Sequence, residues 1–251
     1  MKIVSWNVNG LRSVIKKNAL DQIFKEDPDI ICLQETRCPK DLDWMQYIPS
    51  TYKYNLIVPS SKAGYAGVGL VSKWKPQRIL HTDDILEQGR CICAEFKTFY
   101  VVNLYVPNSK SDLSALSRRT TVWEPGVRNL IKDLSKTKPI IVVADFNVAP
   151  AEIDIYMKKK PTDHGATPTE RNDFQKLLNE CKLIDTYREL NPKTKEWTWF
   201  SNFGKAREHN HGWRIDMALV SESIKSKVVE SSILGHVQGS DHIPISITLK
   251  P

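Results

Sequence analysis

The sequence lacks the features that would assign it to the membrane or secreted proteins. No stretch approaches the roughly 18 uninterrupted apolar residues of a membrane-spanning helix, and Met1 leads directly into a strand-like segment without a signal peptide. The five cysteines are odd in number and scattered, with one Cys-x-Cys pair at Cys91 and Cys93, which fits neither a disulfide framework nor the usual zinc spacing. We therefore expect an intracellular protein with reduced thiols and no membrane partner.

Several catalytic signatures are also missing. The chain has no Gly-x-Ser-x-Gly sequence for a nucleophilic serine, no P-loop and no Gly-rich dinucleotide fingerprint. Its cysteines lie in apolar or unpaired settings, where a reactive thiolate is not favoured. These absences argue against acyl transfer, P-loop nucleotide hydrolysis and dinucleotide-dependent redox chemistry.

Positive charge is the main compositional feature of the 251 residues. The formal net charge is +7 and the pI is near 9.1, and basic residues cluster at 118–119 and 158–160. Such a balance suits a polyanionic partner such as nucleic acid. Many basic proteins bind no nucleic acid, so charge alone does not decide the partner.

The hydrophobic pattern alternates between strand-like and helix-like segments, which is typical of an α/β fold. Strands are expected at residues 3–6, 30–33, 67–71, 100–105, 140–143, 215–220 and 243–249, and amphipathic helices at 18–25, 123–134 and 174–183. No linker-like or low-complexity segment divides the chain. We expect one compact domain spanning 1–251.

Two of the expected strands end in a similar way. The first runs into Asn7-Val8-Asn9 and the fifth into Asp145-Phe146-Asn147. Because side chains alternate along a strand, the polar residues of each triplet share one side, and two halves packed face to face would deliver all four into one cleft. Asn and Asp also cap turns after strands, and this explanation stays open for either triplet alone.

Other strand ends carry polar residues that suit phosphodiester hydrolysis. Carboxylates and amides without thiolates are typical ligands of a hard cation such as Mg²⁺ or Mn²⁺, and a histidine beside them can contact phosphate. For the Asp-His pair near the C-terminus a simple surface turn is the alternative. The additional strand-end residues are Glu35, Tyr105, Asn108, Asp216, Asp241 and His242.

Seven segments in this order resemble the motifs of the exonuclease III family of abasic-site endonucleases, within the wider endonuclease/exonuclease/phosphatase superfamily. They are residues 3–12, 33–37, 64–68, 103–108, 145–147, 212–216 and 239–242. The resemblance extends from residue 3 to about residue 249 and implies a four-layered α/β sandwich like that of DNase I, with two packed mixed β-sheets flanked by helices. The site would lie at one end of the sheets.

The resemblance also implies a Mg²⁺ cofactor, with Mn²⁺ as a substitute, and Glu35 as its principal ligand. The other residues expected near the metal are Asn7, Asn9, Asp145, Asn147, Asp241 and His242.

Catalytic roles carry over to five positions. Asp145 resembles the residue that orients or deprotonates the attacking water, and Asn147 is a donor beside it. His242 resembles a phosphate contact, with Asp216 as the carboxylate that orients the ring and favours its protonated form. Tyr105 adds a hydrogen bond to the phosphate. The family leaves open whether Asp145 is the true base and whether one metal or two take part.

Substrate recognition is expected in an aromatic segment. Trp199, Trp213 and Ile215 match the apolar pocket that in relatives receives a flipped abasic deoxyribose. Ordinary core packing is the alternative for these residues. Phe203 falls where relatives insert a side chain into the duplex. Further contacts to phosphate are expected from Asn108, Arg37, Tyr65, Lys62, Arg207 and residues 158–160.

Three functions remain distinct at this stage. The first is a Mg²⁺-dependent class II abasic-site (AP) endonuclease of DNA repair, which cuts double-stranded DNA 5′ to the lesion, leaves a 3′-hydroxyl, and also has 3′–5′ exonuclease and 3′-phosphodiesterase activity on blocked ends. Such an enzyme is expected to act as a monomer in the cytoplasm, nucleoid or nucleus. The second is another superfamily phosphodiesterase or phosphatase acting on RNA or phosphoinositides. The third is a non-catalytic nucleic-acid-binding module.

Overall fold

Two six-stranded sheets form the centre of the computed structural model, which describes residues 1–39, 41–80, 82, 86, 88–157 and 162–250. The first sheet has the order β13 (Val228–Ile233), β14 (Ile245–Leu249), β1 (Lys2–Asn7), β2 (Ile30–Gln34), β4 (Val68–Ser72) and β3 (Tyr54–Val58). The second has the order β5 (Arg78–Leu80), β6 (Cys91–Glu95), β7 (Tyr100–Tyr105), β8 (Ile140–Asp145), β12 (Asp216–Ser221) and β9 (Leu183–Asp185).

Both sheets are mixed in the same manner. β1 runs parallel to β2, and β7 runs parallel to β8, whereas the other pairs are antiparallel. Each sheet thus contains a parallel pair at its centre, and the carboxyl ends of β1 and β8 provide the two triplets singled out in the sequence.

Strand β8 of the second sheet is apolar up to its last residue because both of its faces are covered. In β8, Ile141 and Val143 point into the core between the two sheets, and Ile140 and Val142 point into the core beneath the helices. The outer helices of this sheet are α3 (Leu116–Arg118), the π-helical η2 (Arg119–Trp123), α4 (Glu124–Ser135) and α5 (Pro168–Cys181).

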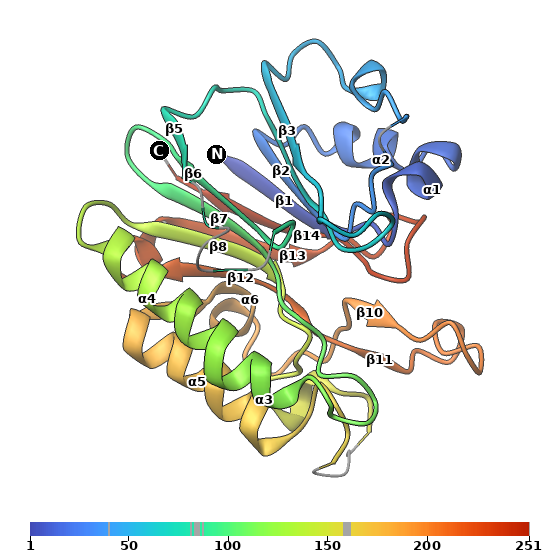
Figure 1. The fold of residues 1–251 in the computed structure, drawn as a ribbon, viewed down its shortest axis with the longest axis vertical. Helices are drawn as coiled ribbons and strands as arrows, with labels where there is room; N and C mark the ends of the chain where they lie inside the picture. Colours follow the sequence, from blue (N-terminus) through green and yellow to red (C-terminus); the bar gives the residue numbers. More distant parts are fainter. Residues whose placement is uncertain (40, 81, 83–85, 87, 158–161, 251) are drawn as a thin grey trace.

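The first sheet is covered on its outer face by α1 (Leu11–Lys16) and α2 (Leu20–Lys25). Figure 1 shows the resulting order of layers, with α1 and α2 on one side of the two sheets and α4 and α5 on the other. The predicted four-layered sandwich is therefore confirmed. The remaining short elements are α6 (Thr186–Leu190), η1 (Met45–Tyr47), η3 (Glu152–Asp154) and η4 (Glu222–Lys227).

A two-stranded hairpin stands apart from the large sheets at the end where β1 and β8 terminate. It consists of β10 (Trp199–Phe200) and β11 (Gly212–Trp213), and isolated bridges join Trp199 to His242 and Trp213 to Ile155. Figure 1 shows this hairpin and its long loop projecting to one side of the sandwich. The hairpin is tied to the sheets next to the predicted site.

The seven expected strands are present, with ends shifted by at most two residues, and three expected helices correspond to α2, α4 and α5. The start of α5 was predicted six residues too late, at Phe174 instead of Pro168. Thr167 caps this helix and Glu170 closes a capping box with it, which extends the helix beyond its apolar stripe. Among the helices of the described residues, none is long and apolar enough to span a membrane.

Candidate active site

The two triplets at the ends of β1 and β8 form matching turns. The backbone N–H of Asn9 donates to Oδ1 of Asn7 at 2.9 Å, and the N–H of Asn147 donates to Oδ1 of Asp145 at 2.9 Å. Asn9 and Asn147 both have left-handed backbones, with φ of 43° and 48°. The strands end before these residues, so Asx turns, and not strand alternation, aim the side chains. The residues that form these two turns are therefore also candidate site residues.

Asn7 connects the two sheets at the base of the site. Its Nδ2 donates to Oδ2 of Asp145 at 2.8 Å and to Oε2 of Glu35 at 3.1 Å, and its side chain is completely buried. Its amide oxygen accepts the Asn9 N–H, so Asn7 presents hydrogen-bond donors to the two carboxylates. Asn7 therefore orients Glu35 and Asp145 in this structure. It was expected near a metal, and it reaches that part of the site only through its hydrogen bonds to these two carboxylates.

His242 and Asp216 form a buried pair beside Asp145. Nδ1 of His242 lies 2.8 Å from Oδ2 of Asp216, and its Nε2 lies 4.0 Å from Oδ2 of Asp145. Burial opposes a charge on the ring, but Asp216, Asp145 and Asp241 outweigh it and raise the pKa of His242 to about 10. The ring is consequently a cation at neutral pH, with Nε2 on the Asp145 side.

Asp145 has an environment that makes its carboxyl group a stronger base than usual. Burial and the nearby Asp216 raise its pKa to about 7, while His242 and the donors from Asn147 and Asn7 act in the opposite direction. A carboxylate that titrates near neutrality can accept a proton from a bound water at physiological pH. The position and the basicity of Asp145 both suit proton abstraction.

Asn147, Asn108 and Tyr105 add polar groups on the β7–β8 side. Nδ2 of Asn108 donates to Oδ1 of Asn147 at 3.0 Å, and Nδ2 of Asn147 donates to the Val106 carbonyl at 2.9 Å. Burial, followed by the charges of Glu35 and Asp145, raises the pKa of Tyr105 well above its usual value. Its phenol is therefore a neutral hydrogen-bond group that contacts Glu35.

The site contains oxygen donors that suit a hard divalent cation. Asp145 and Asp216 place carboxylate oxygens within 4.8 Å of each other beside the protonated ring of His242, and Oδ1 of Asp216 is buried with no hydrogen-bond partner among the described residues. On the first-sheet side, Asn9 donates to Oδ1 of Asp241 at 2.9 Å. Carboxylates without a thiolate fit Mg²⁺ or Mn²⁺ better than a soft metal.

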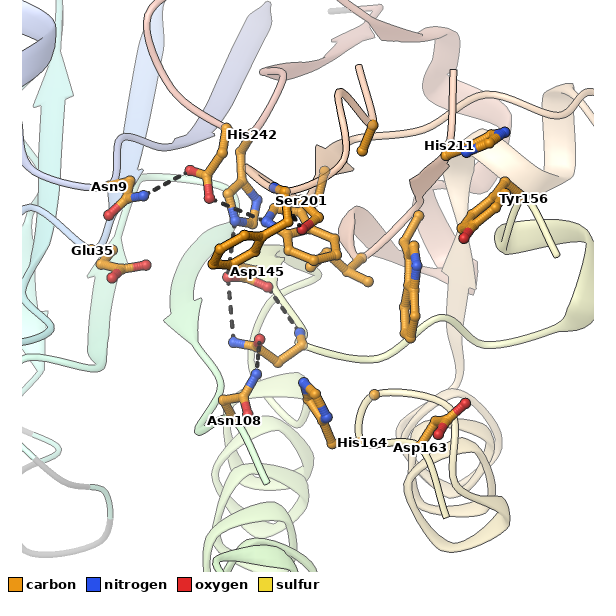
Figure 2. Close-up of a pocket in the computed structure, with 18 of the residues that line it drawn as sticks. Asn9, Glu35, Asn108, Asp145, Tyr156, Asp163, His164, Ser201, His211 and His242 are labelled. Carbon is orange, nitrogen blue, oxygen red and sulfur yellow. Dashed lines mark hydrogen bonds and ion pairs between the residues drawn. The ribbon is translucent and has the colours of Figure 1, made fainter. Parts of the chain in front are cut away.

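These groups line a cleft of about 660 Å³. Figure 2 shows Asn9 and Glu35 on one side of Asp145 and His242, Asn108 and His164 on another, and Tyr156 and His211 farther along. Of the residues predicted for the site, the cleft is lined by Asn9, Glu35, Arg37, Tyr105, Asn108, Asp145, Asn147, Trp199, Phe203, Trp213, Ile215, Asp241 and His242. The structure thus brings together most of the predicted set.

The aromatic part of the cleft is built by the β10–β11 hairpin. The rings of Trp199 and Trp213 meet edge to face with centroids 6.0 Å apart, and Ile215 is buried beside them. Nε1 of Trp199 donates to Oδ2 of Asp241 at 3.2 Å, which couples the apolar wall to the polar site. Phe203 lies in the loop of the hairpin, and 87% of its surface is exposed. An exposed ring of this size at the cleft is suited to contact a ligand.

Sequence reasoning missed several residues of the cleft and its surroundings. Tyr156 and His211 stack with centroids 4.4 Å apart, and His164 also lines the cleft, although neither histidine matched a family role. Arg90 stacks on Tyr105 and donates to the Tyr65 hydroxyl at 2.6 Å. Only the three-dimensional arrangement reveals these contacts, because no motif or spacing in the sequence distinguishes them.

The expected phosphate-contacting residues occupy different settings. Arg37 contacts Glu35 and lines the cleft, whereas Tyr65 and Lys62 pack together next to Arg90, outside the cleft lining. Arg207 donates to the carbonyl of Ser240 at 2.9 Å. Residues 158–160 lie outside the described part of the chain. The suggestion that the 118–119 pair serves a polyanion is wrong for Arg119, because its side chain is buried and bound to acidic residues.

Residues 4–242 match the endonuclease/exonuclease/phosphatase family, and the chain belongs to this family. It is 39% identical over 259 residues to the DNA repair nuclease APEX1 of Danio rerio, covering 99% of this chain and 82% of that protein. An exodeoxyribonuclease of Bacillus subtilis is 37% identical over 257 residues, covering 99% of both chains. The crystal structure of the AP endonuclease LMAP from Leishmania major superimposes with a TM-score of 0.90 at 27% identity, covering 100% of this chain and 88% of that one. These matches confirm the resemblance inferred from the seven motifs.

Proposed function

We propose that this protein is a divalent-metal-dependent DNA repair nuclease that hydrolyses the phosphodiester on the 5′ side of an abasic site and leaves a 3′-hydroxyl. The same site would act on 3′ ends, as a 3′–5′ exonuclease and 3′-phosphodiesterase. The relatives named above as a DNA repair nuclease, an exodeoxyribonuclease and an AP endonuclease support this class of substrate. In the proposal one domain, acting as a monomer on double-stranded DNA inside the cell, carries all of these activities.

One observation carries the proposal. The carboxylate of Asp145 lines the cleft, and its Oδ2 lies 2.8 Å from Nδ2 of Asn7 and 4.0 Å from Nε2 of the protonated His242 ring. A base and a cationic donor thus face the same space, which is the arrangement that phosphodiester hydrolysis needs. A protein that only binds nucleic acid has no comparable need for this buried array of charges.

Each of these residues would have a separate role in the reaction. Asp145 binds a water and takes its proton as the water oxygen attacks phosphorus, and the bond from phosphorus to the 3′ oxygen breaks. The departing oxygen takes a proton from solvent water and becomes the 3′-hydroxyl, and the phosphate stays on the abasic sugar. His242, which Asp216 keeps protonated, donates from Nε2 to a phosphate oxygen as negative charge develops there. Asn147, Asn108 and Tyr105 would add neutral hydrogen bonds.

Glu35 and Asp241, with Asn9 beside them, are the groups that would hold Mg²⁺ or Mn²⁺, and Asp145 and Asn147 line the same cleft. When bound, such an ion neutralises phosphate charge and polarises the phosphoryl group. Asn7 would keep Glu35 and Asp145 oriented in the same site.

Selection of abasic sites would depend on the pocket of Trp199, Trp213 and Ile215. Its apolar walls favour a sugar without a base, and extruding a nucleotide from the helix costs least where pairing is already lost. The exposed ring of Phe203 would enter the duplex as an apolar wedge. Arg37 in the cleft lining and Tyr65 outside it would contact the DNA backbone.

The test is incision of a duplex with a single tetrahydrofuran abasic analogue, with Mg²⁺ and with EDTA. We expect metal-dependent cutting at the lesion, and losses of at least about 100-fold for Asp145→Asn and His242→Asn. His236→Asn is the control, because His236 is exposed and pairs with Glu26. Equal cutting of an undamaged duplex, or cutting in EDTA, would contradict the proposal. Turnover of RNA or phosphoinositides in its place would favour another superfamily activity.

A further inference from the structure

A buried arginine contacts the loop that carries Asn147 from behind the cleft. Arg119 is 1% exposed, and its Nη2 and Nη1 donate to the carbonyl oxygens of Phe146 and Asn147 at 2.8 Å and 3.0 Å. These two residues follow Asp145 directly, and Asn147 has the left-handed φ of 48°. A non-glycine residue keeps such a backbone only where its surroundings hold it. Arg119 supplies that support on two successive carbonyls.

Glu170 extends the support to the neighbouring loop. Its Oε1 accepts hydrogen bonds from Nη1 of Arg119 at 3.1 Å and from the hydroxyl of Ser109 at 2.6 Å. Ser109 follows Asn108, whose Nδ2 donates to Oδ1 of Asn147 at 3.0 Å. The contacts therefore form a closed circuit from Arg119 through both amide side chains and back through Glu170. Neither amide can turn without breaking a contact in this circuit.

The helix that carries Arg119 is distorted at this residue. Arg119 opens the π-helical segment η2, and its Nε donates to Oε1 of Glu124, five residues later, at 2.7 Å. In an α-helix, residues five apart are separated by about 140° around the axis and do not face each other. The wider π turn brings the two side chains together, so that Glu124 pairs with Arg119 while Arg119 contacts the Asn147 loop, and such distortions occur often at functional sites.

The charge pattern also points to a role beyond stability. Arg119 is paired with both Glu124 and Glu170 in the protein interior, where desolvation offsets most of the attraction between charges. Apolar residues of the same volume would often stabilise such a position equally well. What they would not provide is a planar set of donors that reaches two carbonyls and a carboxylate together.

We propose that the Arg119–Glu170 ion pair is a positioning element of the nuclease reaction. It acts through Asn147 and Asn108 by fixing their backbone and amide orientation, and it does not contact the DNA. The inference rests on the proposed function, because it requires that Asn147 takes part in catalysis.

The test is a double-mutant cycle measured by the steady-state kinetics of abasic-duplex incision, which give kcat and KM. Arg119→Lys keeps the charge but cannot span both carbonyls and Glu170. We expect it to lower kcat roughly 10- to 100-fold, since small misplacement of catalytic groups costs this much, with little change in KM. In an Asn147→Ala background the same substitution should change the rate less than about twofold. Ser109→Ala, a milder change at the other end of the circuit, should lower kcat less and show the same dependence on Asn147.

Arg128→Lys is the matched control. Arg128 lies on α4, is also largely buried, and faces Asp173 of α5 instead of the Asn147 loop, so its substitution should leave kcat unchanged. Melting temperatures of all variants separate loss of fold from loss of positioning. Equal rate losses for Arg119→Lys with and without Asn147, or normal kcat for both Arg119→Lys and Ser109→Ala, would overturn the inference. Full activity of Asn147→Ala alone would instead remove the site on which the proposed function and this inference depend.

Discussion

Asn7 and Asp145 meet across the two sheets, with 2.8 Å between Nδ2 of the amide and Oδ2 of the carboxylate. The same Nδ2 also reaches Glu35 at 3.1 Å, so one neutral donor lies between two acidic groups. Without it the two carboxylates would face each other across the site with no donor between them. The packing of the sheets and the electrostatics of the site therefore depend on the same side chain.

Asn7→Asp should abolish most of the activity while preserving side-chain size. The new carboxylate would repel Glu35 and Asp145 at hydrogen-bond distance, and loss of a hydrogen bond to a charged group typically costs about 1.5–3 kcal/mol, or about 10- to 100-fold in rate. The measurement is single-turnover incision of the abasic duplex at neutral pH. Asn179→Asp on the exposed face of α5 adds the same charge elsewhere and should retain wild-type rates. Comparable losses in the two variants would show that added negative charge alone weakens the DNA interaction.

The sequence allowed the sandwich and most of the cleft to be predicted because both are encoded locally. Strands such as β8 are apolar on both faces, and polar residues that follow a strand must lie at the edge of the sheet. Turn chemistry refined this prediction. Asn9 and Asn147 reach the site because each closes an Asx turn on the preceding polar residue, which strand periodicity alone does not describe.

Other parts depend on contacts between distant segments. Arg119 appeared to be a surface charge, yet it is buried against residues as far away in the sequence as Glu170. The pair of Tyr156 and His211 forms because an isolated bridge and the β10–β11 hairpin bring residues 55 positions apart into register. The helix start at Pro168 was missed for a different reason, since the Thr167–Glu170 capping box was present in the sequence but lay outside the apolar stripe.

Asp216→Asn should release the proton of His242 at lower pH. With the partner charge removed, burial of the ring opposes its protonation more effectively, so its pKa should fall below the wild-type value of about 10. NMR titration of the metal-free protein would follow the His242 ring signals directly. We also expect lower kcat at neutral pH, because less imidazolium is available to the phosphate. An unchanged ring titration would show that Asp216 does not maintain its charge.

The raised pKa of His242 also predicts how the free energy of unfolding depends on pH. His242 has a higher pKa folded than its ordinary value of 6.5, so its contribution is complete below about pH 6.5 and is lost as pH rises through about 10. Asp145, with a pKa of about 7, also titrates at the lower end of the range from pH 7 to 10, so the difference between the wild type and Asp216→Asn is what isolates the histidine. Urea unfolding across this range should show a falling free energy for the wild type and a flatter profile for Asp216→Asn. Parallel profiles would assign the pH dependence to other groups.

Glu35→Gln should weaken metal binding more than folding. The carboxylate charge attracts a hard cation, and the amide keeps the size but loses that charge. Adding Mg²⁺ to the wild type should raise its Tm by mass action, and the rise should be much smaller for the variant. Glu189→Gln, which removes an exposed partner of Lys225, should respond to Mg²⁺ like the wild type. An equal Mg²⁺ response in Glu35→Gln would place the ion on other ligands.

Trp199→Ala should reduce selectivity for abasic sites more than it reduces phosphodiester hydrolysis. Trp199 forms one wall of the apolar pocket with Trp213, and removing its ring would open space for a nucleotide that retains its base. Its indole N–H also holds Asp241 at 3.2 Å, so some loss of rate is expected on every substrate. Rates on a tetrahydrofuran duplex, an undamaged duplex and a 3′-blocked end separate these effects. Trp74→Ala, at an exposed tryptophan outside the cleft lining, is the control. If Trp199→Ala lowers the rates on the abasic and 3′-end substrates by the same factor, the tryptophan serves the polar site through Asp241 and does not select the lesion.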